Sequence, residues 1–143
     1  PAPAEALAEE LWSLVDIAVP NEVEAEFYSG IPVDSEESAA AAAEWFHRRG
    51  VEHVIITLAE RGTYYSGNGE HYLVPAFSVQ AVDTTGAGDA FCGGLLAALS
   101  EDYPMRDAIR FASAVAALSV QRIGTAPAMP DRRKILDFLA TIR

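Results

Sequence analysis

The residues that could do chemistry gather in one glycine-rich stretch of the chain. Residues 83–89 read DTTGAGD, after an alternating segment and before a long run of helix formers. Gly86 and Gly88 have no Cβ and tolerate positive φ, so the backbone there can approach a ligand closely. We expect the N–H groups of Gly86, Ala87 and Gly88 to converge on an anion at the open end of a helix, where unpaired amides and the helix dipole favour negative charge.

Asp89 would lie beside that anion. A carboxylate in this place could accept a proton from a hydroxyl that attacks a bound phosphoryl group. A plainer interpretation is also open, because an Asp near a helix N-terminus is a favourable cap and glycines after a strand often only make the turn. No Lys-Ser or Lys-Thr follows the glycines, so the stretch is not a P-loop.

A second polar pattern follows Pro20, where Asn21-Glu22-Val23-Glu24 opens a short helix. Asn21 and Glu24, three residues apart, have the form of a capping box with Asn in place of Ser or Thr. A purely structural interpretation of this pair therefore stands beside a functional one. The three histidines, His47, His53 and His71, are too scattered to suggest a metal site.

These segments must be positioned by alternating helices and strands. Residues 4–14 are expected to form an amphipathic helix with Leu7, Leu11 and Leu14 inward. Residues 54–58 (VIITL) have the continuous apolar character of a buried strand. The other elements we expect are strands at 16–19, 63–65, 71–74 and 77–82, with Asn68-Gly69 in a hairpin turn, and helices at 21–30, 35–49, from about Asp89, 105–121 and 131–142. This order predicts an α/β sandwich with antiparallel strands toward one edge.

Composition limits the class of protein. The chain has 143 residues, 50% of them hydrophobic, which fits one globular domain. A formal net charge of −11 argues against nucleic acid or an anionic membrane as partner. The single cysteine, Cys92, suits a reducing compartment, and with no signal peptide or long apolar run we expect a cytoplasmic protein. A start without methionine is typical of a piece of a longer polypeptide or a processed chain.

The stretch DTTGAGDAFCGGLLAAL closely resembles the second signature of the ribokinase (PfkB) family of sugar and nucleoside kinases. The similarity runs from Pro1 to Arg143 through NEVEAE, VIITLAERG and IRFASAVAALSVQRIGTAP, in the order of the C-terminal half of that family. It implies a three-layer α/β/α sandwich. Residues 1–143 would form its C-terminal nucleotide-binding and catalytic portion, without the N-terminal sugar-binding part and the lid.

The resemblance also implies an activity. We expect an ATP-dependent sugar kinase that uses Mg²⁺ and is activated by K⁺, with O5 of D-ribose as the favoured acceptor and a homodimer when full-length. Deoxyribose, fructose or a nucleoside is the alternative acceptor. A nucleotide-binding fragment without activity is a further alternative, and this chain alone is expected to be inactive because the acceptor hydroxyl must be placed close to the γ-phosphorus.

The family's functional residues carry over by position. Asp89 matches the catalytic base, the amides of Gly86, Ala87 and Gly88 match the anion hole, and Glu24 matches an acid that acts on Mg²⁺ through water. The residues implied to bind ATP are Asn21, Thr57, Leu58, Ala59, Glu60, Arg61, Gly62, Gly88, Asp89 and Ser113. Those implied to bind K⁺, mostly through backbone carbonyls, are Asp83, Thr85, Ser119, Arg122, Gly124 and Ala128.

Two of these positions depart from the family pattern, and two have simpler explanations. The family commonly has Gly in place of Ala59, and often Ser in place of Ala128, so one K⁺ ligand would be absent or replaced by water. Ser113 is also explained as a small helix residue. Asp83 is also explained as the first residue of a turn whose side chain bonds its own backbone.

Overall fold

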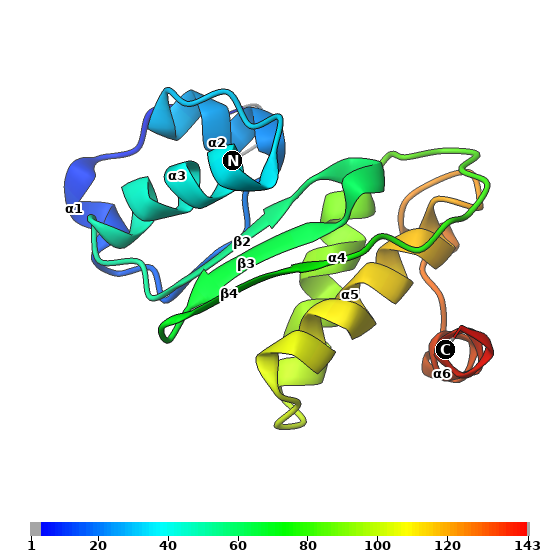
Figure 1. Ribbon diagram of the computed structural model, residues 1–143. Coiled ribbons are helices and arrows are strands. Elements are labelled where there is room, and N and C mark those ends of the chain that lie inside the picture. Colours follow the sequence, from blue (N-terminus) through cyan, green and yellow to red (C-terminus); the bar gives the residue numbers. More distant parts are fainter. Residues whose placement is uncertain (1–3, 143) are drawn as a thin grey trace. The chain divides into compact units, whose positions relative to one another are not determined.

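The computed structural model describes residues 4–142, drawn in Figure 1. The chain divides into two compact units on either side of the Pro75–Ala76 bond. The expectation of one globular domain is not tested by this division and stays a prediction. In the described part of the chain, no helix is both long and apolar enough to cross a membrane.

The first unit is built on a four-stranded sheet. Its strands are β1 (Ile17–Ala18), β2 (His53–Thr57), β3 (Thr63–Gly67) and β4 (Glu70–Val74), in the spatial order β1-β2-β3-β4. β1 is parallel to β2, whereas β2, β3 and β4 are antiparallel, which confirms the predicted antiparallel edge. Asn68 and Gly69 have φ of 52° and 76°, as a tight two-residue hairpin turn requires.

Three helices cover one face of this sheet: α1 (Glu9–Trp12), α2 (Glu22–Ser29) and α3 (Glu36–His47) (Figure 1). Ser35 caps α3 by accepting a hydrogen bond from the N–H of Ser38. The alanine-rich inner face of α3 lets the helix lie close to the strands. The core between helices and sheet contains Trp12, Ala25, Ala39, Ala42, Ala43, Phe46, Val54, Ile56 and Tyr64.

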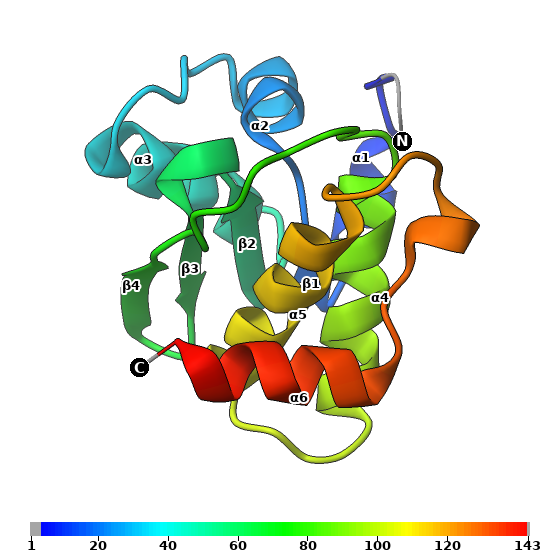
Figure 2. The same ribbon diagram turned by 90° about the vertical axis from the view of Figure 1, so that its right-hand side faces the viewer.

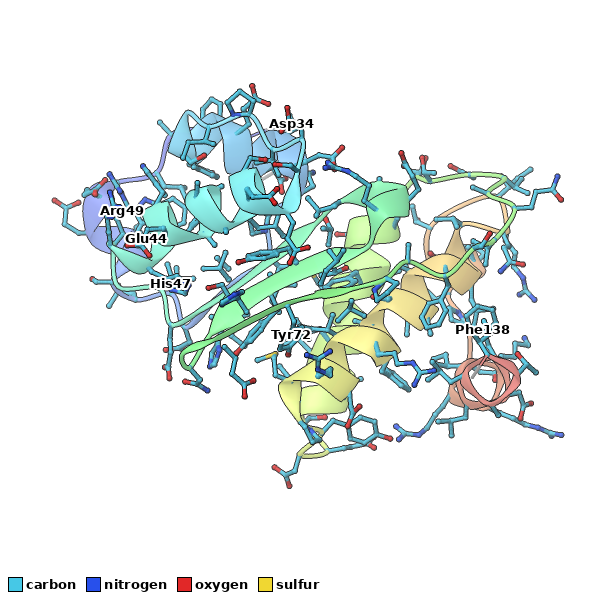
Figure 3. The ribbon with its side chains drawn as sticks, in the orientation of Figure 1. Asp34, Glu44, His47, Arg49, Tyr72 and Phe138 are labelled. Atoms are coloured by element: carbon cyan, nitrogen blue, oxygen red, sulfur yellow. The ribbon has the colours of Figure 1, made fainter. Side chains whose placement is uncertain are left out.

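His47, labelled in Figure 3, links the end of α3 to the sheet through hydrogen bonds. Its Nδ1 lies 2.9 Å from the Val51 carbonyl oxygen and its Nε2 lies 2.8 Å from Ser66 Oγ on β3. Because a carbonyl only accepts, Nδ1 carries the hydrogen, and in the neutral ring Nε2 accepts from the serine hydroxyl. His47 is thus a packing and hydrogen-bonding residue.

The first predicted helix is wrong in its extent. Residues 4–8 are not helical, and α1 has only four residues. Leu7, Leu11 and Leu14 are exposed, and Trp12 is the residue buried from this segment. A short helix is marginal in water unless an apolar face is buried, and here only one turn reaches the core.

The second unit is helical. α4 (Ala87–Leu99) and α5 (Met105–Ser119) pack side by side, and α6 (Arg132–Thr141) crosses them, as Figure 2 shows. Phe138 on α6 contacts Phe77 at a ring-centroid distance of 5.2 Å (Figure 3). A single 3-10 turn, η2 (Ala126–Ala128), lies between α5 and α6.

The strand predicted at residues 77–82 is absent from the described structure. This segment is irregular, and its end is held by the N–H groups of Val82 and Asp83, which both donate to the Val120 carbonyl at 2.7 and 3.0 Å. Alternation alone cannot make a strand, because a strand also needs a neighbour for its backbone groups. Here the two N–H groups at its end bond to the residue that follows α5.

Gly94 sets how closely α4 approaches α5. A Cβ built on Gly94 would lie 2.8 Å from Val115 Cγ2 and 3.0 Å from the Ala112 Cα, both on α5. A Cβ on the neighbouring Gly93 would meet nothing within 4 Å. Of these two adjacent glycines, only Gly94 is therefore needed for the close contact between α4 and α5.

We expect Gly94→Ala to lower the free energy of unfolding by about 1–3 kcal/mol, because the added methyl group overpacks the α4–α5 contact. Gly93→Ala is the matched control and should raise it by about 0.5–1 kcal/mol, since Ala is the better helix former at an open position. Urea denaturation of the two variants measures both changes. Equal effects of the same sign would contradict this account of the packing.

The turn between β2 and β3 holds a residue in a costly conformation. It forms the 3-10 turn η1 (Ala59–Arg61), and the Leu58 N–H donates to the Gly62 carbonyl at 2.8 Å. Ala59 has a φ of 48°, in the left-handed region that glycine occupies without a Cβ penalty. The backbone at this position thus fits Gly better than Ala.

Ala59→Gly should raise the free energy of unfolding by about 1 kcal/mol, since it relieves the left-handed strain of a residue with a Cβ. The control is Ala41→Gly, at an exposed position inside α3, which should lower it by about 1 kcal/mol because glycine is a poor helix former. Urea titrations of the two variants measure both changes in the free energy of unfolding. A destabilised Ala59→Gly protein would show that the turn is not strained.

Candidate functional site

In the first unit, the start of α2 lies beside the end of β2. Asn21 forms an isolated parallel bridge with Thr57, and the Thr57 N–H donates to the Pro20 carbonyl at 3.0 Å. This follows from the parallel pairing of β1 with β2, which places both carboxyl ends at the same edge of the sheet. Two polar segments far apart in the sequence are thereby brought together.

Asn21 and Glu24 form a complete capping box. The Glu24 N–H donates to Asn21 Oδ1 at 2.8 Å, and the Asn21 N–H donates to Glu24 Oε2 at 2.9 Å. The structural interpretation of this pair is therefore confirmed. It does not exclude the functional one, because a carboxylate that accepts one bond keeps further lone pairs for water.

The loop after β2 contains both buried and exposed residues. Leu58 and Gly62 are buried, while Ala59 and Glu60 are exposed. The guanidinium of Arg61 is bound within the unit: its Nη2 donates to Glu22 Oε2 at 3.3 Å and to the Val33 carbonyl at 3.0 Å. Sequence reasoning did not single out Glu22 or Val33, since no local pattern links them to Arg61.

In the second unit, Gly86 begins α4 in a conformation that only glycine adopts freely. Its φ is 76°, and no side chain caps the helix. A Cβ on Gly86 would lie 3.0 Å from Thr125 Cγ2, so both the backbone angle and the available space disfavour a side chain. Thr125 was not predicted from the sequence, because its contact with Gly86 joins two distant loops.

The three amides expected to converge on an anion are not equivalent. The Ala87 N–H donates to the Thr84 carbonyl at 3.1 Å and closes the turn, which corrects the expectation that all three amides are free to converge on an anion. Gly88 and Asp89 are both exposed in the first turn of α4. The amides of a first turn have no acceptor inside their own helix, so the end of α4 still favours an anion.

Asp83 joins the glycine turn to the loop after α5. Its Oδ1 accepts from the Thr85 N–H at 2.9 Å and its Oδ2 accepts from the Gly124 N–H at 3.0 Å. The bond from Gly124, followed by those from Thr85, lowers the pKa of Asp83 from 3.8 to about 2. The stabilisation from the ionised carboxylate is thus present above pH 3.8 and is lost as the pH falls toward 2. The turn-forming role of Asp83 is confirmed.

The segments implied to bind K⁺ lie next to one another in this unit. The Asp83–Gly124 bond and the bonds from the 82–83 amides to the Val120 carbonyl hold the two loops together. A carboxylate and nearby backbone carbonyls are the oxygen donors that hard cations prefer, so the residues fit such an ion. Among the described residues, no cluster of three or more His, Cys, Asp or Glu side chains could hold a metal.

Three other predicted residues use their polar groups locally. The Ser119 side chain is buried, and its hydroxyl donates to the Ala116 carbonyl at 2.8 Å. The Ser113 hydroxyl donates to the Ile109 carbonyl at 2.9 Å, as expected of a small helix residue. Ala128 is buried in η2, where its N–H donates to the Thr125 carbonyl.

Known proteins share this sequence and this fold. Ribokinase from Haemophilus influenzae is 48% identical over 97% of the chain, which covers 45% of that protein. Thermotoga maritima ribokinase has a solved structure that matches with a TM-score of 0.88 at 38% identity, over 98% of the chain and 47% of its own length. Arabidopsis thaliana ribokinase, solved with ribose and ATP, matches with a TM-score of 0.88 at 36% identity, over 92% of the chain and 43% of its own.

The fold is therefore a partial ribokinase-like α/β fold, with its mixed sheet and six α-helices in the described residues. The chain spans about half the length of the relatives it matches. The profile of the pfkB family of carbohydrate kinases matches residues 1–132, which is most of the chain. The chain belongs to the pfkB family of carbohydrate kinases.

Proposed function

We propose that the full-length protein containing this chain transfers the γ-phosphoryl group of ATP to O5 of D-ribose. Residues 1–143 would be the C-terminal nucleotide-binding and catalytic portion of its domain. The proposal is supported by family membership, by ribokinases among the relatives, and by the ribose and ATP bound to the Arabidopsis relative. We propose that the enzyme is soluble and acts in the cytoplasm.

The observation that carries the proposal is the start of α4. Gly86 turns the chain into the helix without a side-chain cap, and Asp89 is exposed one turn later. In the proposed reaction the Gly86 and Gly88 amides stabilise the migrating phosphoryl group, and the Ala87 amide joins them if it leaves Thr84. The Asp89 carboxylate takes the proton of the sugar hydroxyl while the hydroxyl oxygen bonds to phosphorus and ADP departs.

The remaining residues would hold the nucleotide and its ions. Asn21, the 57–62 loop and Ser113 are proposed to line the ATP site. Glu24 would bind Mg²⁺ through water, and that ion would neutralise phosphate charge. The 83–85 and 119–128 segments would hold K⁺ beside the phosphoryl site, where its charge strengthens the anion hole.

Two alternatives differ in acceptor or in activity. Another family kinase would phosphorylate deoxyribose, fructose or a nucleoside, and a panel of these acceptors with ATP separates them. A nucleotide-binding fragment without turnover is favoured for the isolated chain, because it spans about half the length of its relatives. Homodimer formation is proposed for the full-length protein only, and sedimentation of that protein tests it.

Asp89→Asn in the full-length protein should lower kcat by about 10²–10⁴-fold while the KM for ATP changes little, because only proton transfer is removed. The matched control is Asp107→Asn, since Asp107 is also exposed in the first turn of its helix, α5. The control should keep its activity. Steady-state kinetics with ribose and ATP measure both variants, and retained turnover in Asp89→Asn would remove Asp89 as the base.

Asp83→Asn should weaken activation by K⁺ at least several-fold, because an amide offers one acceptor oxygen and cannot bridge Thr85 and Gly124 as the carboxylate does. Asp131→Asn is the control: Asp131 accepts the Lys134 N–H at 2.9 Å as the cap of α6. Rates measured over a K⁺ titration give the result. Unchanged K⁺ dependence in Asp83→Asn would place the ion elsewhere.

A further inference from the structure

Arg61 is the one strongly basic side chain of the β2–β3 loop, which the proposed function places along the nucleotide. A positively charged side chain in such a loop would be expected to contact phosphate. The structure directs its charge elsewhere. One nitrogen, Nη2, donates both to Glu22 Oε2 at 3.3 Å and to the Val33 carbonyl at 3.0 Å.

The two acceptors belong to segments on either side of α2. Glu22 is the first residue of α2, directly after Asn21, and Val33 is a buried residue in the connection from α2 to α3. Arg61 is the last residue of η1. Its side chain therefore links the loop after β2 to both ends of the α2 segment.

This link supplements a turn that is otherwise closed by short-range bonds. The Leu58 N–H donates to Gly62, the Arg61 N–H donates to Leu58, and the Gly62 N–H donates to Ala59. These bonds fix the shape of the turn but not its position relative to α2. Ala59 in the left-handed region makes the turn costly to hold. The Thr57 N–H, which donates to the Pro20 carbonyl, fixes the start of the loop, and the Arg61 side chain adds a constraint at its other end.

We propose that Arg61 is a positioning residue, which holds the Ala59–Gly62 turn against the start of α2 through Glu22 and Val33 and does not itself contact phosphate. The proposal rests on the proposed function, in which Asn21 and the turn together bind ATP. Its effect is to fix the spacing of these two nucleotide-binding segments. The Glu22 carboxylate also offsets part of the Arg61 charge, in an ion pair whose two side chains are each 36% exposed.

The two roles predict opposite results at Glu22. If Arg61 binds phosphate directly, removing Glu22 frees a cation and removes a negative charge, and the KM for ATP should fall or stay unchanged. If Arg61 acts by position, removing Glu22 should raise the KM for ATP as removing Arg61 does. Glu26→Met is the matched control, because Glu26 is an exposed glutamate one turn further along the same helix.

We would compare Arg61→Met, Glu22→Met, their double variant and Glu26→Met in the full-length protein. Both single variants should raise the KM for ATP by about three- to tenfold with kcat nearly unchanged, the effect expected of residues coupled by contact, and the double variant should add little. A raised KM in Arg61→Met alone would overturn the proposal. So would a lowered KM in Glu22→Met beyond that of Glu26→Met.

Hydrogen exchange of the turn separates this proposal from the proposed function. The amides of Leu58, Arg61 and Gly62 should exchange faster in Arg61→Met and in Glu22→Met than in Glu26→Met, without any nucleotide present. Unchanged exchange in these variants overturns the positioning role even if the protein is a kinase. Faster exchange in a protein that phosphorylates no sugar would support the link while the proposed function fails.

Discussion

The structure depends on the requirement that loop backbone groups find hydrogen-bond partners. Both candidate regions meet it with a side chain that reaches across to another segment. Asp83 accepts amides from its own turn and from the loop after α5, and Arg61 donates to a backbone carbonyl beyond α2. An unpaired buried backbone group costs as much as a lost hydrogen bond, so such side chains decide where the loops lie. Charge-assisted bonds thus help to hold the loops that would do chemistry.

A second constraint is steric: two glycines lie where a side chain would crowd neighbouring atoms. Gly94 lets α4 approach α5, and Gly86 fits against Thr125 with a positive φ. These glycines serve packing and turn geometry at the same helix that carries Asp89. The closely packed α4–α5 pair supports the short turn at its end, as a pre-organised anion site needs.

The sequence predicted well where local patterns carry the information. The capping box of α2, the Asn68-Gly69 hairpin, the buried β2 strand and the glycine turn before α4 all depend on neighbouring residues, and all are present. Prediction failed at residues 4–14 and 77–82. In both, the periodicity was right for a helix or a strand, but the segment lacked enough burial or a strand partner.

By itself, the sequence determined the elements, the glycine-dependent turn and the family, because spacing and residue type act over a few residues. Only the tertiary structure decided the partners of the functional side chains. It placed Thr57 beside Asn21, the Asp83 carboxylate against Gly124 and the Arg61 charge on Glu22. The reason is physical: these contacts join segments far apart in the chain, and only the packing of strands and helices determines which of them meet.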